Sequence, residues 1–136
     1  MVPEPQKALM QYRLSVAEER LEASQLLLDS GHFKDSINRS YYAIFYMLRA
    51  ILALDCVDFK KHAGVIAYFQ KNYIKTGILP TKMSKYVTAA FQIRNDADYQ
   101  DFFVVSEQDA SEQYERAKEM CDEIKDYLQK RVVGTV

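Results

Sequence analysis

Residues 33–54, FKDSINRSYYAIFYMLRAILAL, decide the fold, because their apolar side chains lie on almost every side of a helix. One row repeats every three or four residues, as a helix face does; its members are Ile37, Tyr41, Ile44, Leu48 and Ile51. The other faces also carry large apolar side chains, namely Tyr42, Phe45, Tyr46 and Leu52. A helix that is apolar on most sides is buried on most sides. We therefore expect this segment to be the centre of a helical bundle or half of a dimer interface.

The segments on either side of this helix have simpler, one-sided apolar patterns. A first helix is expected over about 6–30, where Gly31 supplies the stop signal. A shorter helix is expected over 62–75, and Pro80 is well placed to open a fourth helix. No segment alternates with the two-residue period of a strand. The pattern of the whole chain is therefore helical.

The last helix has the cleanest pattern. Ser106 and Asp109 resemble an N-cap with an acidic first turn. The apolar row that follows comprises Ala110, Tyr114, Ala117, Cys121, Ile124 and Leu128. Residues 131–136, RVVGTV, are expected to be a frayed tail. The sequence thus predicts an all-α, up-and-down bundle of four long or medium helices and one shorter helix, in a single domain over 1–136 with its core at about 6–130.

Composition excludes several classes of protein. The 136 residues are 49% hydrophobic and 27% charged, with 4 Gly and 3 Pro, which favours one compact helical domain. No stretch reaches the ~18 apolar residues of a membrane span, and the N-terminus lacks a signal-peptide pattern, so we expect a cytoplasmic protein. Cys56 and Cys121 form no CxxC pair. His32 and His62 have no second ligand one helical turn away, so we expect neither a metal site nor a cofactor.

Charge is unevenly distributed along the chain. Residues 59–95 contain seven basic and no acidic residues, whereas the remainder contains 11 basic and 19 acidic residues. A local positive field of this kind attracts phosphate-bearing ligands or acidic partners. The alternative is a solvated surface that the acidic helices beside it neutralise. Charge asymmetry alone does not decide between the two.

Arg94 interrupts the apolar row of the fourth helix, whose members are Met83, Val87, Ala90, Arg94 and Ala97. Asp98 lies one turn further on, so one interpretation is an Arg94–Asp98 pair that finishes the helix. The other is a guanidinium that binds a phosphate or carboxylate bidentately in a cleft. An exposed pair contributes only ~0.3–0.5 kcal/mol and does not explain the apolar neighbours, so we favour the cleft.

Two stretches together resemble a known family. SYYAIFYMLRAIL, residues 40–52, resembles the second helix of HEPN domains, small helical proteins that often accompany minimal nucleotidyltransferases. KHAGVIAYFQKNYIKTGILP, residues 61–80, followed by RNDADY, residues 94–99, resembles the branch of HEPN-like proteins in which Arg-x3-Asp-Tyr closes the fourth helix. The resemblance covers about residues 7–128. It implies a HEPN-like bundle that forms a homodimer, with the motif of the fourth helix in a cleft between the two copies.

The resemblance also implies a range of activities. Many HEPN proteins are metal-independent ribonucleases that act as toxins, and the accompanying nucleotidyltransferase can act as antitoxin, in some modules by adding AMP to a tyrosine. Their motif is an arginine, a polar residue directly after it, and a histidine about one turn later. Arg94 and Asn95 match the first two positions, but Asp98 and Tyr99 stand where the histidine would fall. Metal-free RNA cleavage needs a group that removes the proton of a 2′-hydroxyl near neutral pH, and imidazole has a suitable pKa. A carboxyl or phenol in that position would need a strongly shifted pKa.

Four residues of the fourth helix are thus candidate catalytic residues: Arg94, Asn95, Asp98 and Tyr99. Candidate ligand-binding residues are Arg94, Arg39, Asn38 and His62, the last at a helix start that favours anions. Tyr41 and Tyr42 are expected to be packing residues. We expect a toxin-like or regulatory partner of a minimal nucleotidyltransferase that binds RNA or a nucleotide through Arg94. A ribonuclease with a non-standard motif and a non-catalytic dimeric scaffold stay open as alternatives.

Overall fold

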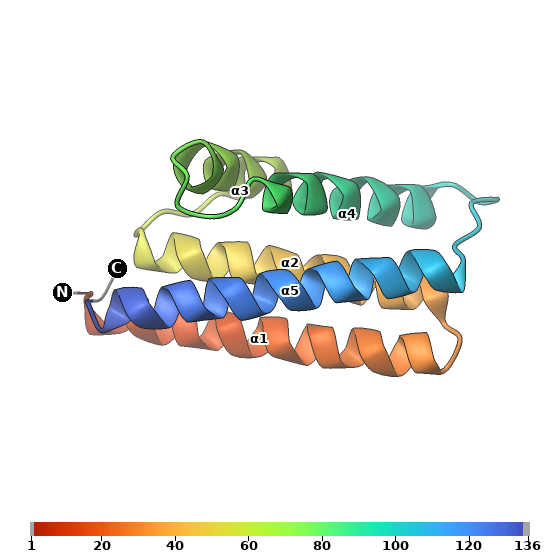
Figure 1. Cartoon of the computed structure of the whole chain (residues 1–136), viewed down its shortest axis with the longest axis horizontal. Coiled ribbons are helices and arrows are strands. Elements are labelled where there is room, and N and C mark those ends of the chain that lie inside the picture. Colours follow the sequence, from red (N-terminus) through yellow and green to blue (C-terminus); the bar gives the residue numbers. More distant parts are fainter. Residues whose placement is uncertain (1, 135–136) are drawn as a thin grey trace.

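The structure, a computed structural model, describes residues 2–134 and confirms the predicted all-α, up-and-down bundle (Figure 1). Its elements are α1 (Glu4–Asp29), α2 (Phe33–Leu54), α3 (His62–Phe69), the π-helical turn η1 (Gln70–Ile74), α4 (Lys82–Tyr99) and α5 (Glu107–Val132). The helices α1, α2 and α5 lie side by side, and α3 and α4 lie on the far side of α2 from α1. The single helix expected over 62–75 is therefore an α-helix that widens into a π-helical turn.

The helix α2 is the centre of the bundle. Of its 22 residues, 14 are buried, and it packs against α1, α3, α4 and α5. Leu48 and Ala50 are both 0% exposed although, two residues apart, they lie on nearly opposite sides of the helix. Of the two roles that its sequence allowed, the bundle centre is therefore confirmed, because its apolar faces are covered within one chain.

The helix ends follow the predicted signals with one exception. Gly31 adopts a φ of 80°, the left-handed conformation that ends α1. At the start of α5, Ser106 Oγ accepts a hydrogen bond from the backbone of Asp109, whose carboxylate accepts one from the backbone of Ser106. The prediction that Pro80 opens α4 is wrong by two residues. The Pro80 carbonyl accepts a hydrogen bond from the Met83 backbone in a turn, and the helix begins at Lys82.

The C-terminal segment is held in place further than expected. We predicted a frayed tail from Arg131, but α5 continues to Val132. Arg131 Nη2 lies 2.6 Å from Asp55 Oδ1, and its Nη1 donates a hydrogen bond to the Tyr73 hydroxyl at 2.9 Å. The hydroxyls of Tyr68 and Tyr73 both donate to Asp55 Oδ2. This network ties the end of α5 to the end of α2. The last two residues of the predicted tail, 135–136, lie outside the described residues.

Residues 2–134 contain neither a membrane-spanning helix nor a group of metal-ligating side chains. No described helix is long and apolar enough to cross a bilayer. Within the same residues, no group of three or more His, Cys, Asp or Glu side chains could hold a metal ion. The cysteines are both free, Cys56 exposed and Cys121 buried.

Candidate functional site

Arg94 is a residue of α4, and its side chain lies at the contact between α4 and α2. The apolar row on which it stands is buried, since Met83, Val87 and Ala90 are all at most 2% exposed. The Arg94 side chain itself is 14% exposed. This row therefore packs against the central helix of the same chain, and Arg94 is the charged group at the edge of that contact.

Four neighbouring side chains surround the Arg94 guanidinium. Its Nη2 donates to the hydroxyl of Tyr42 at 3.0 Å, and its Nη1 donates to Oδ1 of Asn95 at 3.1 Å. Its Nε is 3.1 Å from Asp98 Oδ2, but the N–H is not directed at the carboxylate, so this contact is an ion pair without a hydrogen bond. Its Cζ lies 5.2 Å from the ring centre of Tyr41 and 5.4 Å from that of Tyr42. We call these five residues the Arg94 cluster.

The cluster combines features of both interpretations of Arg94. The Arg94–Asp98 pair is present, as the helix-finishing interpretation requires. The guanidinium is nevertheless mostly buried and bound to α2, as the apolar neighbours suggested. Tyr41 is a packing residue, 2% exposed, as expected. Tyr42 also packs against the core as expected, and its hydroxyl in addition accepts the hydrogen bond from Arg94.

His62, the first residue of α3, lies next to the Arg94 cluster and contacts it from a different helix. Its Nδ1 lies 2.8 Å from the hydroxyl of Tyr41, and its ring centre lies 4.0 Å from that of Phe45. It also meets the ring of Tyr42 edge-on, with 6.0 Å between the ring centres. An imidazole and a guanidinium thus contact the same two tyrosines. No histidine lies near Arg94 in the sequence of α4. No local sequence pattern predicts the contact of His62 with Tyr41 and Tyr42, because these residues are far apart in sequence.

The environment favours the neutral form of His62. Burial lowers the pKa of its imidazole, and the positive charges of Arg94 and Arg49 lower it further. Burial raises the pKa of the Tyr41 phenol despite the nearby Arg94 charge, so Tyr41 stays protonated at neutral pH. A neutral imidazole beside a protonated phenol and a guanidinium can accept a proton.

The other candidate residues lie outside this cluster. Arg39 is exposed and donates a hydrogen bond to Asn38 at 3.3 Å, and among the described residues neither bonds to Arg94. Asn38 stands one helical turn before Tyr42 on α2, so it lies on the same side of the helix. Tyr99 is 76% exposed, and its hydroxyl has no hydrogen bond to any residue of 2–134. The structure thus groups Arg94, Asn95 and Asp98 but leaves Tyr99 in solvent.

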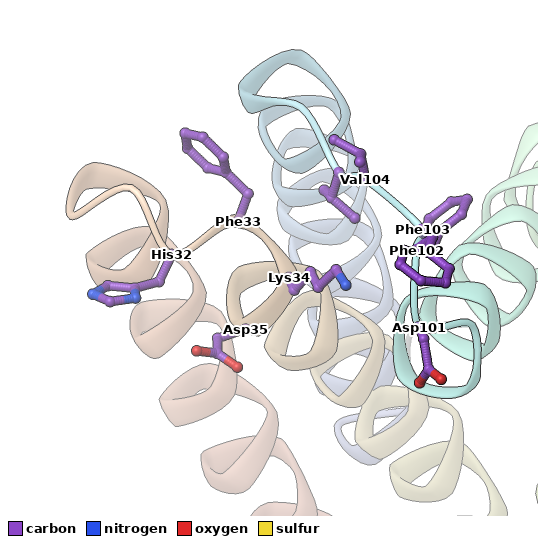
Figure 2. Close-up of a pocket in the computed structure, with 9 residues that line it drawn as sticks. His32, Phe33, Lys34, Asp35, Asp101, Phe102, Phe103 and Val104 are labelled. Atoms are coloured by element: carbon purple, nitrogen blue, oxygen red, sulfur yellow. The ribbon is translucent and has the colours of Figure 1, made fainter.

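Two cavities lie near the candidate residues. One, of about 550 Å³, lies between the start of α2 and the α4–α5 connection, and Figure 2 shows side chains of both segments around it. Its charges are mixed, because Lys34 is accompanied by Asp35 and Asp101. The other, of about 480 Å³, includes His62 and is lined by Phe45, Arg49, Asp58, Phe59, Lys60 and His62. Only this second cavity adjoins the Arg94 cluster, through His62.

Comparisons with known proteins agree on one family. The family model of the HEPN domain matches residues 10–127. A Thermotoga maritima protein named as a UPF0332 protein is 29% identical over 121 residues, which are 89% of this chain and 92% of that protein. A Methanocaldococcus jannaschii protein named as a candidate toxin is 32% identical over 112 residues, 82% of this chain and 76% of its own. A second candidate toxin from that organism is 33% identical over 90 residues, 66% of this chain and 67% of its own.

Proposed function

The chain belongs to the HEPN domain family, and we propose that it is a toxin-like or regulatory protein that binds RNA or a nucleotide through the Arg94 cluster. The observation that carries this proposal is the arrangement of Arg94. Its guanidinium is mostly buried, and tyrosines from another helix hold it in one orientation. A guanidinium that is fixed in advance loses little side-chain entropy when it binds a phosphate.

The bonds of Arg94 leave one of its N–H donors, the buried Nε–H, to a ligand that displaces Asp98. The Nε–H is not directed at any acceptor among the described residues, and Asp98, its charge partner, is 34% exposed. A phosphate can therefore take the position of the Asp98 carboxylate without breaking the hydrogen bonds to Tyr42 and Asn95. The basic segment 59–95, which contains both His62 and Arg94, would attract that phosphate over a longer range.

The proposed assembly is a homodimer that acts with a minimal nucleotidyltransferase. The family membership and the names of the two archaeal relatives support a toxin-like role. In this arrangement the partner enzyme regulates access to the Arg94 cluster. Light scattering of the purified chain tests the dimer, and a stable monomer would remove the idea of a cleft shared by two copies.

The RNA-binding role is tested by fluorescence anisotropy with a labelled single-stranded RNA at several salt concentrations. The matched variants are Arg94→Ala and Arg116→Ala, since Arg116 also pairs with a carboxylate four residues away and lies over a tyrosine ring, but on α5. We expect wild type and Arg116→Ala to bind, with affinity that falls as salt rises, and Arg94→Ala to bind at least about tenfold more weakly. Equal binding by the two variants would refute the role of Arg94.

A second candidate function, a metal-independent ribonuclease, is favoured by the position of His62. His62 suits the role of the motif histidine better than Asp98 or Tyr99 does, because its neutral imidazole lies beside the tyrosines of the Arg94 cluster. In that reaction the imidazole takes the proton of a 2′-hydroxyl while Arg94 binds the phosphate that is attacked. The 2′-oxygen bonds to phosphorus to give a 2′,3′-cyclic phosphate, the bond from phosphorus to the 5′-oxygen breaks, and the imidazolium gives its proton to that leaving oxygen. Incubation of an end-labelled RNA pool in EDTA with wild type, His62→Gln and Arg94→Ala tests it. Cleavage by all three proteins would indicate a contaminant.

A further inference from the structure

The cavity beside His62 has a lining that suits one part of a nucleic acid strand. We call it the Arg49 pocket; its residues are Phe45, Arg49, Asp58, Phe59, Lys60 and His62. Phe59, 41% exposed, supplies aromatic surface, whereas Phe45 is 6% exposed and packs against the His62 ring. Arg49 and Lys60 supply positive charge at the same opening. Aromatic rings interleaved with cations are the usual surface for single-stranded nucleic acid.

The positive charge of the Arg49 pocket is only partly neutralised. Asp58 Oδ2 lies 3.6 Å from Nη2 of both Arg13 and Arg49, which is too long for hydrogen bonds. The other oxygen of Asp58 accepts the backbone N–H of Phe59. One carboxylate thus faces two guanidiniums, and Lys60 has no ion pair with any described residue. A buried Nε of Arg49 also has no hydrogen-bond partner within residues 2–134. An unpaired buried donor at an under-neutralised site favours an anionic ligand.

The Arg49 pocket and the Arg94 cluster lie along one side of α2. Tyr42, Phe45, Tyr46 and Arg49 are spaced three, four and seven residues from the first, so they share a helix face. His62 lies on Phe45, between the two sites. Tyr42 and Arg49 are two helical turns apart, about 10 Å along the axis. The two guanidiniums therefore stand at opposite ends of a row of aromatic rings.

We propose that the Arg49 pocket binds a backbone phosphate of single-stranded RNA, at the same time as another phosphate of that strand lies at the Arg94 cluster. This inference rests on the proposed RNA-binding function and extends it from one arginine to a track along α2. A nucleoside monophosphate carries a single phosphate and cannot fill both positions. The track therefore selects a strand of several nucleotides over a free mononucleotide.

The test uses a fluorescently labelled single-stranded hexamer of uridine and the variants Arg49→Gln, Lys60→Gln, Arg94→Ala and Arg116→Gln. Lys60 is exposed, so its replacement leaves the fold intact. The backbone carbonyl of Arg49, which accepts a hydrogen bond from Arg13, is unchanged in Arg49→Gln. We expect Arg49→Gln and Lys60→Gln each to weaken binding about tenfold and to reduce the slope of log affinity against log salt by about one.

The outcomes separate this inference from the function on which it rests. Loss of affinity in Arg94→Ala, Arg49→Gln and Lys60→Gln but not in Arg116→Gln supports the track. Loss in Arg94→Ala alone overturns the track and leaves the RNA-binding function in place. No binding by wild type overturns both. Displacement of the hexamer by uridine monophosphate at comparable concentrations would also overturn the track, because a strand that spans two sites outcompetes a ligand that fills one.

Discussion

The hydroxyl of Tyr42 on α2 accepts a hydrogen bond from Arg94 on α4, across 52 positions of sequence. This bond converts an arginine that interrupts an apolar row into part of a helix–helix contact. Because the bond uses Nη2, the Nε side of the guanidinium remains free of directed hydrogen bonds among residues 2–134. In the proposed function, stability and ligand binding thus depend on different edges of one side chain.

Tyr42→Phe tests the structural part of this arrangement. It removes the acceptor of Arg94 and keeps the ring, so we expect a loss of about 1 kcal/mol in the free energy of unfolding. Arg94→Ala removes the hydrogen bond and both ring contacts and is expected to cost about 1–2 kcal/mol. Chemical denaturation of both single variants and the double variant measures the coupling. Strictly additive losses would mean that the two side chains do not interact.

The pKa of His62 is expected to lie below the ordinary histidine value, because burial and the charges of Arg94 and Arg49 disfavour the imidazolium. NMR titration of the ring protons measures it, with His32→Gln used to assign the two histidine signals. Replacement of Arg94 or Arg49 by Gln should raise the midpoint of His62. A midpoint that does not change in either variant would place the two charges too far away to act.

The same shift predicts a pH dependence of stability. The folded state disfavours protonated His62, so between the folded pKa and about 6.5 the unfolded chain binds more protons and stability rises with pH. On acidification from about pH 7.5 to about pH 5, wild type should therefore lose more stability than His62→Gln. Urea denaturation at a series of pH values gives the comparison. A parallel decline in both proteins would show that His62 makes no contribution.

The anchor at the end of α5 is tested by truncation. A chain that ends at Lys130 loses the Arg131 contacts with Asp55 and Tyr73, and we expect a loss of about 1–3 kcal/mol. A chain that ends at Val133 keeps these contacts and should match the full chain. Thermal unfolding of the two truncated chains separates the effects. Equal stability of both would restore the interpretation of a frayed tail from Arg131.

Sequence periodicity was sufficient for the fold because most of this bundle consists of local helical patterns. The all-round apolarity of residues 33–54 placed α2 at the centre, and Gly31 and Ser106 marked helix ends through their own backbone and side-chain chemistry. The Asp55–Arg131 anchor was missed, because it joins residues that are far apart in sequence and individually unremarkable.

The grouping of the candidate residues was predictable only where they share a helix; His62 was a candidate because it begins a helix, not because it lies near Arg94. Arg94, Asn95 and Asp98 follow from spacing along α4, and the structure brings them together. Tyr42, His62 and Arg49 come from other elements, so their association depends on how α2, α3 and α4 pack. No short sequence motif predicts the contact between His62 of α3 and Tyr41 of α2. Long-range packing therefore decides the chemistry of this site.

NMR chemical-shift mapping observes the binding of RNA at the Arg94 cluster residue by residue. Short single-stranded RNA is added to isotope-labelled protein, and the backbone and side-chain signals are followed through the titration. We expect the signals of Tyr42, Arg94, Asn95 and His62 to shift together, and the titration of Arg94→Ala to need at least about tenfold more of the same RNA. Shifts confined to the outer surfaces of α1 and α5, or no shifts with wild type, would contradict the proposed binding site.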